Sequence, residues 1–413
     1  MNQNGQDEKK LEHIIELEKQ LGEIQDADVL LERILTETRK IVNADAGSIY
    51  VTEGNKLKIK YAQNDTHLKE LAPGFKLPYT VFSFQIDEKS ICGYVAMTGK
   101  PVNIKDAYRI SESKPYKFNK NSDITTDYRT KSIYTFPLKM ANGKLLGILQ
   151  IINAKDENGH VISFDNEAEL MIAHFASSAI QALQHAYVTS NMVKRMLKMA
   201  EFRDPKETYY HVQRVSSYSL EIYDRWAFNH NIPELERHKY RDSLKIAAKF
   251  HDVGKVGISD IILKKEYPRL TEDERDIMKC HTCIGAQLFD PPDSLLDEMS
   301  KDVTLHHHDR WDGGCSGYPG NVRLDEFSIN EEIIPKGLTA LSGTDIPLAA
   351  RIVAVADVFD ALSHKRCYKP AWSIDDSFTE IQNNSGSQFD PEVVLAFMQI
   401  KDRICAIQME FQD

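Results

Sequence analysis

The sequence predicts two folded domains, an α+β domain followed by an all-α domain, joined by one long helix. Short alternating segments separated by turn residues occupy residues 47–153, and no Pro or Gly interrupts the helical pattern of residues 164–203. From residue 204 to residue 413 one helical pattern follows another, with no convincing run of strand residues. At 413 residues the chain is long enough for each domain to bury its own core.

The bulk composition disfavours several classes of protein. A net charge of −11 argues against a DNA- or RNA-polymer binder, although a local metal cluster can still attract a small anionic substrate. The N-terminus lacks a secretory pattern, and no apolar run approaches the roughly 20 residues of a membrane span. Six cysteines are too few for a disulfide framework in so long a chain. We therefore expect a cytoplasmic protein with no membrane partner.

The first half of the chain begins with helical periodicity over residues 8–42, and residues 1–24 are expected to form a separate N-terminal helix. Alternating segments then predict strands at residues 47–51, 57–61, 133–137 and 145–153. Glu53-Gly54-Asn55 and Ala141-Asn142-Gly143 are turn signals between them. A further helix is expected from near Gly93 to Gly99.

This order of elements resembles the GAF domain, a small α+β sensory module. The residues that carry the resemblance are Ala46-Gly47-Ser48-Ile49-Tyr50, Cys92-Gly93-Tyr94-Val95-Ala96-Met97-Thr98-Gly99-Lys100-Pro101-Val102-Asn103-Ile104 and Gly147-Ile148-Leu149-Gln150-Ile151-Ile152-Asn153. The resemblance implies a GAF sensory domain at residues 25–185 that regulates the rest of the chain. A small-molecule ligand for it is compatible with the resemblance, which does not identify one.

The long helix predicted at residues 165–203 carries apolar residues along its whole length. A helix of this length between two domains commonly packs against a second copy of itself, so we expect a homodimer. The alternative is a linker helix that packs on its own two domains.

The second half of the chain carries imidazoles and carboxylates in a pattern suited to several metal ions. His251-Asp252 is followed by His281, by the triplet His306-His307-His308 and by Asp357 within an apolar run. Neutral imidazole suits iron, manganese or zinc, and a carboxylate between two sets of imidazoles can bridge two ions. Such a site generates hydroxide near neutral pH and holds a phosphodiester for attack. The pattern therefore predicts a metal-dependent phosphodiesterase.

The same region resembles the HD-GYP family, a branch of the HD metal-dependent phosphohydrolases that hydrolyses cyclic di-GMP. The strings that carry the resemblance are His251-Asp252-Val253-Gly254-Lys255-Val256-Gly257-Ile258, His281-Thr282-Cys283-Ile284-Gly285, His307-His308-Asp309-Arg310-Trp311-Asp312-Gly313, Gly317-Tyr318-Pro319, Ile346-Pro347-Leu348-Ala349-Ala350-Arg351-Ile352 and Asp357-Val358-Phe359-Asp360-Ala361-Leu362. The resemblance implies an all-α HD-type metallophosphohydrolase domain at residues 204–413. Its expected substrate is cyclic di-GMP, and the expected product is pGpG, GMP or both.

The resemblance also implies the metal ligands. They are Glu207, His211, His251, Asp252, His281, His307, His308 and Asp357. Asp252 would bridge two ions, and Glu207 would permit a third, so two or three divalent metals are expected, with iron first and manganese second. An ordinary surface pair four residues apart on a helix is the alternative for Glu207 and His211.

Other residues are expected to contact substrate or support the ligands. By resemblance, Asp252 and Lys255 are catalytic, Lys255, Arg366 and Lys369 contact phosphate, and Tyr318 lines the guanine side of the pocket. A solvated basic loop is the alternative for the segment that contains Arg366 and Lys369. We expect His306 and Asp360 to pack or to support ligands rather than bind metal.

The chain departs from the family pattern around the Gly-Tyr-Pro turn. Asp309 stands where the family usually has Glu, residues 313–317 contain extra residues, and the loop over residues 320–345 is longer than usual. Usual Asp and Pro residues are also missing around Arg366. Two alternatives therefore stay open, a non-catalytic cyclic di-GMP receptor and a phosphodiesterase for a mixed cyclic dinucleotide. Cys280 and Cys283 are interpreted as core residues of a helix rather than as a separate zinc or redox site.

Overall fold

The computed structural model describes residues 15–22, 24, 26–73, 82–140, 142–203, 209–265, 268–320, 323–324, 340–364 and 371–411. The chain divides into two compact units between Ser190 and Asn191, inside helix α6 (Asn166–Arg203). Each unit is considered by itself below. Within the described residues, no helix combines the length and the apolar character needed to span a membrane.

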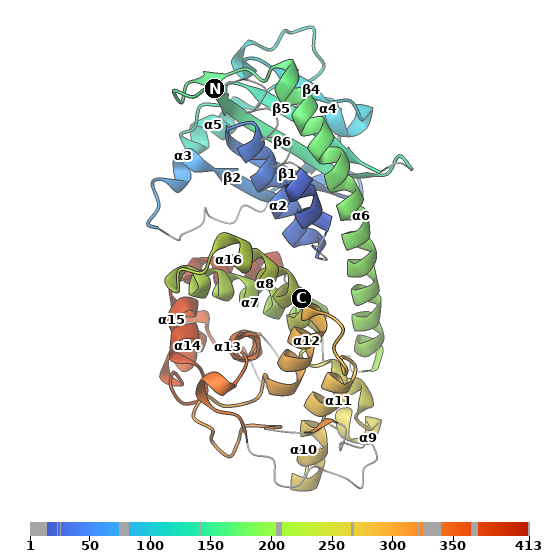
Figure 1. Ribbon diagram of the computed structural model, residues 1–413, viewed down its shortest axis with the longest axis vertical. Helices are drawn as coiled ribbons and strands as arrows, with labels where there is room; N and C mark the ends of the chain where they lie inside the picture. The colour runs from blue at the N-terminus through green and yellow to red at the C-terminus, as the bar shows by residue number, and fades with distance from the viewer. Residues whose placement is uncertain are drawn as a thin grey trace. The chain divides into compact units, whose positions relative to one another are not determined.

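A seven-stranded antiparallel sheet forms the centre of the first unit (Figure 1). The strand order is β3-β2-β1-β6-β5-β4, and β7 pairs with β6. The strands are β1 (Ala44–Glu53), β2 (Lys56–Asn64), β3 (Ser83–Gln85), β4 (Val102–Ile104), β5 (Ile133–Lys139), β6 (Leu145–Lys155) and β7 (Val161–Ile162). The four strands predicted from alternation, β1, β2, β5 and β6, are confirmed. The other three are too short to show an alternating pattern.

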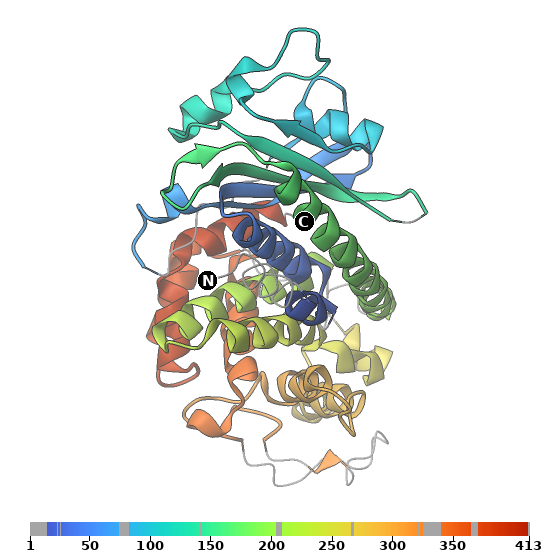
Figure 2. The same ribbon diagram turned by 45° about the horizontal axis from the view of Figure 1, so that its top comes forward.

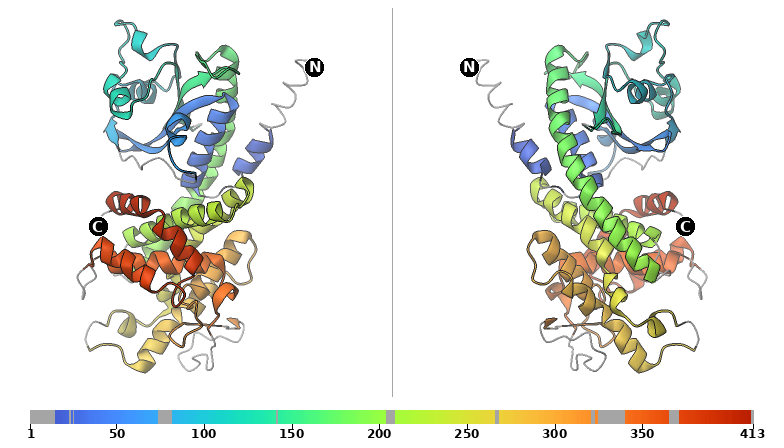
Figure 3. Two further views of the ribbon diagram at one scale, coloured as in Figure 1. Left: turned by 90° about the vertical axis from the view of Figure 1, so that its left-hand side faces the viewer. Right: turned by 90° about the vertical axis from the view of Figure 1, so that its right-hand side faces the viewer.

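Helices cover both faces of this sheet. Adjacent residues of β1 point to opposite faces: Ile49 packs with α2 (Ala27–Ile41) and the first part of α6, whereas Tyr50 packs with α4 (Ile91–Thr98). Figures 2 and 3 show α2 and α6 side by side on one face, with the cyan segment that contains α4 on the other. Besides the helical residues 15–22, the described part of this unit contains three short helices, namely α3 (Asp65–Leu68), η1 (Ala107–Arg109) and α5 (Lys120–Thr126). This arrangement is the predicted α+β domain.

Helix ends in the first unit follow ordinary capping chemistry. The Ser90 hydroxyl accepts a hydrogen bond from the Gly93 amide at 3.0 Å, so α4 begins slightly before the predicted start. Gly99 ends this helix with a φ of 64°, as the sequence predicted. Asp26 caps α2 by accepting from the Asp28 amide at 2.9 Å, which separates α2 from the helical residues 15–22.

Helix α6 contains 38 residues, which confirms the long helix predicted from the sequence. Its first part buries residues such as Ile172 and Phe175 in the core of the first unit. Its last part buries Val193 and Leu197 against Phe250 in the second unit. One continuous helix therefore contributes to both hydrophobic cores.

The second unit is helical, and its described residues contain no strand (Figure 1). Its α-helices are α7 (Tyr209–Asn229), α8 (Glu234–Ala247), α9 (Asp260–Leu263), α10 (Glu272–Lys279), α11 (His281–Gln287), α12 (Leu295–His306), α13 (Leu348–Ser363), α14 (Ile374–Asn383), α15 (Pro391–Met398) and α16 (Lys401–Glu410). Its 3₁₀ turns are η2 (Ala248–Phe250), η3 (Val253–Gly257) and η5 (Gly343–Asp345). The predicted all-α domain is confirmed.

Aromatic packing fixes helix α13 in the core of the second unit. The Phe359 ring is fully buried and lies 5.5 Å from Tyr218 of α7, 4.9 Å from Phe378 of α14 and 5.1 Å from Phe397 of α15. Because Asp357 and Asp360 flank this anchored position on the same helix, the packing also determines where their carboxylates lie.

Candidate metal centre

Seven side chains from separate segments of the second unit converge on one region. The ligand candidates come from the start of α7, the turn between η2 and η3, the start of α11, the end of α12 and the middle of α13. They are His211, His251, Asp252, His281, His307, His308 and Asp357. Segments up to about 150 residues apart in sequence thus meet as the family resemblance predicts.

A close backbone approach brings α11 to the His251-Asp252 turn. A Cβ atom on Gly254 would lie 1.8 Å from the His281 carbonyl oxygen and 2.4 Å from the Gly285 amide nitrogen. Only glycine therefore permits this contact between η3 and α11. The contact places His281 beside Asp252, which explains the glycine in His251-Asp252-Val253-Gly254-Lys255.

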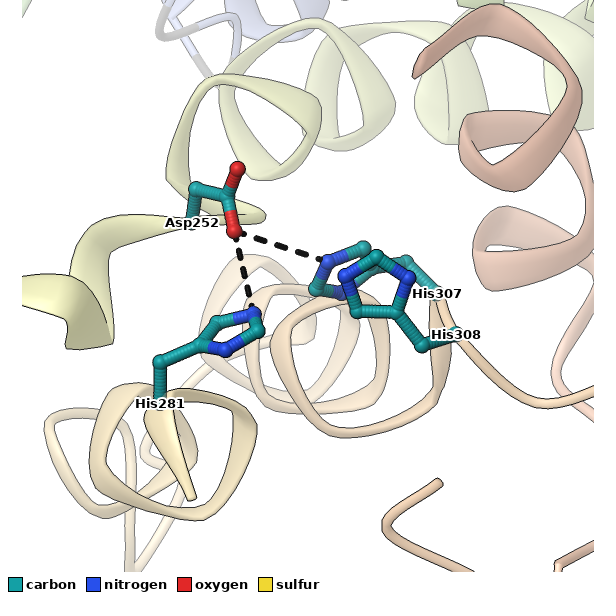
Figure 4. A group of neighbouring side chains, drawn as sticks. All are labelled: Asp252, His281, His307 and His308. Atoms are coloured by element: carbon teal, nitrogen blue, oxygen red, sulfur yellow. Dashed lines mark ion pairs between the residues drawn. The ribbon is translucent and has the colours of Figure 1, made fainter. Parts of the chain in front are cut away.

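The seven residues form two groups, and Asp252 lies between them. One group is Asp252, His281, His307 and His308, and the other is His211, His251 and Asp357. Asp252 Oδ1 lies 3.0 Å from His281 Nε2 and 3.8 Å from His307 Nε2, as the dashed lines in Figure 4 show. Its other oxygen, Oδ2, lies 3.3 Å from His251 Nε2. One carboxylate thus presents one oxygen to each group, as a bridging ligand does.

Asp357 completes the second group from helix α13. Its Oδ1 atom lies 3.6 Å from His211 Nε2 and 3.9 Å from His251 Nε2. These separations are too long for hydrogen bonds and leave room for an ion between the three groups.

Four of the five imidazoles are oriented by a hydrogen bond at Nδ1. Nδ1 donates to a backbone carbonyl in three of them and to a carboxylate in the fourth: His251 to Ala248 O (2.9 Å), His281 to Met278 O (2.8 Å), His307 to Val303 O (3.0 Å) and His211 to Asp360 Oδ2 (2.8 Å). With Nδ1 protonated, the neutral ring presents the Nε2 lone pair. Each ring is thus held in the tautomer that binds a metal through Nε2.

The buried polar atoms at the centre fit a metal better than an empty protein interior. Nε2 of His251, Nε2 of His281, Nε2 of His307 and Oδ1 of Asp252 are all buried and make no hydrogen bond of good geometry with the described residues. Unsatisfied buried polar atoms each cost roughly 1–3 kcal/mol, so several together are costly to leave unpaired. Coordination to divalent ions would satisfy all of them, and the donor set of imidazole and carboxylate is the one that such ions accept.

The protonation states of Asp252 and His308 also suit metal binding. Burial alone would raise the pKa of the Asp252 carboxyl, but Lys255, His251 and His281 outweigh it and hold that pKa well below its usual range. Burial, reinforced by His307 and His281, lowers the pKa of His308 well below its usual value. The carboxylate is therefore ionised and the His308 imidazole neutral at pH 7, as metal ligation requires.

Lys255 lies against the same carboxylate. Its ammonium Nζ is 2.7 Å from Asp252 Oδ2, the oxygen that faces the His211, His251 and Asp357 group. A rotation of the Lys255 side chain would therefore bring its ammonium to an anion bound between the two groups. This position is compatible with the predicted phosphate contact.

A buried ion pair supports His211 from behind. The Asp360 carboxylate accepts from His211 Nδ1 and from Arg214 Nε and Nη2, at 2.8, 2.7 and 3.1 Å respectively. His364 Nδ1 lies 3.2 Å from Asp360 Oδ1. Although burial would raise the pKa of Asp360, its hydrogen bonds from His211, His364 and Arg214 hold that pKa far below its usual range. Asp360 therefore supports a ligand, the role expected from the sequence.

The structure brings together most of the residues that the sequence predicts for the site. Tyr318 lies beside the first group, with its ring centroid 4.6 Å from that of His308. His306 points elsewhere and pairs with Asp309, with His306 Nδ1 2.7 Å from Asp309 Oδ2. Three predicted residues, Glu207, Arg366 and Lys369, lie outside the described residues, as does most of the long loop that follows the Gly-Tyr-Pro turn.

Sequence reasoning missed Arg214 and the carbonyls that orient the histidines. Arg214 follows His211 by three residues on α7 and so shares its face, a signal that the spacing could have given. The carbonyls of Ala248, Met278 and Val303 have no signature in the sequence, because every residue carries the same backbone acceptor. Cys283 is buried in a hydrophobic cluster, which agrees with its interpretation as a core residue.

Known domain families match both units of the chain. The GAF domain family matches residues 26–183, and the HD domain family matches residues 208–362, with a second HD family matching residues 335–393.

Proteins of named function are similar to parts of this chain. A cyclic di-GMP phosphodiesterase of Vibrio cholerae is 34% identical over 277 residues, which cover 65% of this chain and 50% of that protein. A cyclic di-GMP phosphodiesterase of Thermotoga maritima is 34% identical over 215 residues, covering 52% of this chain and 50% of that protein. A 3'3'-cGAMP-specific phosphodiesterase of Vibrio cholerae is 33% identical over 225 residues, covering 54% of this chain and 37% of that protein. The chain thus spans about half the length of the first two relatives. The chain thus matches the GAF family in its first unit and the HD family in its second, and it is similar to cyclic di-GMP phosphodiesterases over about half to two thirds of its own length.

Proposed function

We propose that this protein is a metal-dependent phosphodiesterase that hydrolyses cyclic di-GMP. The observation that carries the proposal is the placement of Asp252, whose two oxygens face two separate groups of ligand side chains. A pair of divalent ions in such a site supplies a water of lowered pKa and a polarised phosphoryl group. The names of the relatives from Vibrio cholerae and Thermotoga maritima support cyclic di-GMP as the substrate.

In this proposal the side chains divide the work of binding and charge stabilisation. Asp252 and the two histidine groups hold the ions, while Glu207 would add a ligand for a third. The Lys255 ammonium, which lies 2.7 Å from Asp252, would turn to a phosphate oxygen and offset the charge that develops on it. Arg366 and Lys369 would bind the other phosphate. We expect iron as the metal and manganese as the second choice, because imidazole and carboxylate suit both.

A mixed cyclic dinucleotide is the second candidate substrate. A relative named a 3'3'-cGAMP-specific phosphodiesterase is 33% identical to this chain, close to the value for the cyclic di-GMP enzymes. The chain also departs from the family pattern at residues 313–317, beside Tyr318. A non-catalytic receptor is disfavoured, because pure binding would not require two groups of buried metal-ligand atoms.

A substrate comparison on the metal-loaded protein separates these functions. We expect full-length protein purified without oxygen to contain at least two metal equivalents and to cleave cyclic di-GMP with a higher kcat/KM than 3'3'-cGAMP. Chromatography of the products distinguishes pGpG from GMP, and chelation followed by metal addition should abolish and then restore turnover. A higher kcat/KM for 3'3'-cGAMP would select the second candidate. Full metal loading with no turnover of either would instead establish the receptor.

We also propose that the protein is a cytoplasmic homodimer in which α6 pairs with its copy and transmits signals from the GAF domain. Five apolar residues in the second half of α6 are between 46% and 73% exposed, whereas Val193 and Leu197 on another side of the helix are buried. They are Val188, Met192, Met196, Met199 and Phe202. Their spacing of three and four residues forms the narrow stripe through which helices pair.

Charged substitutions in this stripe test the dimer. Met192→Glu combined with Met199→Glu should convert the dimer to a monomer, since two carboxylates would be buried in the seam. Size-exclusion chromatography with light scattering gives the mass directly. Lys194→Glu introduces an acid on another side of the same helix and should leave the dimer intact. A parent protein that is monomeric at assay concentration would contradict the proposal.

A further inference from the structure

His308 is held differently from the other four imidazoles of the centre. Those four each donate an Nδ1 hydrogen bond to a carbonyl or carboxylate. The His308 ring makes no hydrogen bond with any residue that the structure describes, and it is also more exposed than its neighbour His307. Something other than a hydrogen bond must therefore fix the direction of its lone pair.

The ring of Tyr318 is stacked against His308. Their centroids are 4.6 Å apart with an angle of 26° between the planes. The Tyr318 amide also donates to the His308 carbonyl oxygen at 3.3 Å, so the Gly-Tyr-Pro turn contacts both the backbone and the ring of this residue. The His308 ring also contacts the ring of His307, with the two centroids 4.0 Å apart and an angle of 43° between the planes. Two aromatic contacts thus confine the imidazole to one plane.

Rotation of the His308 ring would break this arrangement. In Figure 4 the His308 ring lies next to that of His307, facing the space shared with Asp252 and His281. A turn about the Cβ–Cγ bond would aim its nitrogens away from that space and lose the stacking on Tyr318. Stacked aromatic pairs contribute about 0.5–1.5 kcal/mol beyond the area that they bury, comparable to one neutral hydrogen bond.

We propose that Tyr318 is a positioning residue for His308, doing by ring stacking what Nδ1 hydrogen bonds do for the other four histidines. The proposal rests on the metal centre proposed above, but not on its substrate. It assigns to the tyrosine of the Gly-Tyr-Pro turn a role in metal affinity at the group of Asp252, His281, His307 and His308. One face of the Tyr318 ring is occupied by His308, so contact with a substrate base is left to its other face and its edge.

Metal titration of Tyr318 and His308 variants tests the role without any substrate. Full-length metal-free protein is titrated with manganese(II) alone by calorimetry, and the cobalt(II) form is compared by visible absorption. Tyr318→Phe keeps the ring and should bind both equivalents as the parent does. Tyr318→Leu should weaken one of the two equivalents by about 10–100-fold, the usual effect of losing a residue that orients a ligand. Its cobalt spectrum should shift towards that of His308→Ala.

A double-mutant cycle separates positioning from general structural support. If Tyr318 acts through His308, adding Tyr318→Leu to His308→Ala should change the affinity by less than about twofold. Retention of the other metal equivalent, held by His211, His251 and Asp357, reports that the domain is folded. If the leucine variant loses both equivalents, Tyr318→Met takes its place, because it fills similar volume without a planar ring.

Substitution of Lys279, a neighbour of Tyr318, provides the control. Lys279 Nζ lies 5.8 Å from the centroid of the same tyrosine ring, so Lys279→Gln changes a neighbour of Tyr318 but neither its ring nor a ligand, and should leave manganese affinity unchanged. Parent affinity in both the leucine and methionine variants would overturn the proposal, as would an equal loss in the presence and absence of His308. An altered KM with unchanged metal affinity would assign Tyr318 to substrate binding alone. The proposed phosphodiesterase fails separately, through absence of turnover in protein that binds its metals.

Discussion

Asp252→Ala should remove both metal equivalents and lower kcat by at least about 10³-fold, the scale of losing a group central to charge stabilisation. The reason is geometric: one oxygen of this carboxylate faces His281 and His307, and the other faces His251. The other candidate carboxylate among the described residues, Asp357, lies in one group alone. Metal content by mass spectrometry and turnover of cyclic di-GMP are measured on the same preparation.

A matched carboxylate controls for the loss of charge. Asp260 at the start of α9 is exposed and belongs to neither group of candidate ligands, so Asp260→Ala should retain metal and activity. Asp357→Ala should behave differently from both variants, because it lies in one group alone and should lose one equivalent. Turnover that persists in Asp252→Ala, with metals still bound, would mean that the bridging position is assigned wrongly.

Sequence patterns predicted the long elements of the fold, although helices cover both faces of the sheet and strands β1 and β6 are buried on both. The four strands and the 38-residue helix α6 each repeat their pattern often enough to be recognised. Strands β3, β4 and β7 contain three residues or fewer and owe their existence to pairing with longer neighbours. Such edge segments have no period of their own, so single-sequence reasoning cannot find them.

The seven candidate ligands that the structure brings together could be named from the sequence because they lie in the motifs that carry the family resemblance. What orients them was not predictable in the same way. Nδ1 of His251 and of His281 donate to carbonyls three residues earlier, an arrangement that depends on backbone geometry rather than on residue identity. Gly254 shows the intermediate case: its presence in the motif is visible in the sequence, but its contact with the His281 carbonyl requires the folded chain.

Arg214 shows how a residue outside the metal groups can still control them. Its guanidinium donates twice to the buried Asp360 carboxylate, and its Nη1 donates to the Phe411 carbonyl at 2.9 Å, just beyond α16. Asp360 in turn accepts from His211. The end of α16 is thus connected to a candidate metal ligand through one arginine and one carboxylate.

Arg214→Met should lower the free energy of unfolding of the second unit by about 3–5 kcal/mol, because it leaves a buried carboxylate without its main cation. In a unit of this size the loss corresponds to a fall in Tm of roughly 6–20 °C, measured by calorimetry, with the transition of the first unit unchanged. Lys264→Met removes one partner of an exposed pair with Asp260 and should cost no more than about 0.5 kcal/mol.

A second substitution distinguishes the cost of an unpaired buried carboxylate from the cost of lost packing. If the cost comes from the stranded carboxylate, Asp360→Asn added to Arg214→Met should recover part of the stability, since a neutral amide is far less costly to bury. If the cost came only from the volume of the arginine side chain, the second substitution would add its own loss instead. Metal affinity at His211 should not recover with the stability. The neutral amide of Asp360→Asn cannot replace the charged carboxylate that accepts the hydrogen bond from His211 Nδ1. Stability and metal binding should therefore separate in the double variant, which ties Asp360 to the orientation of His211 rather than to folding alone.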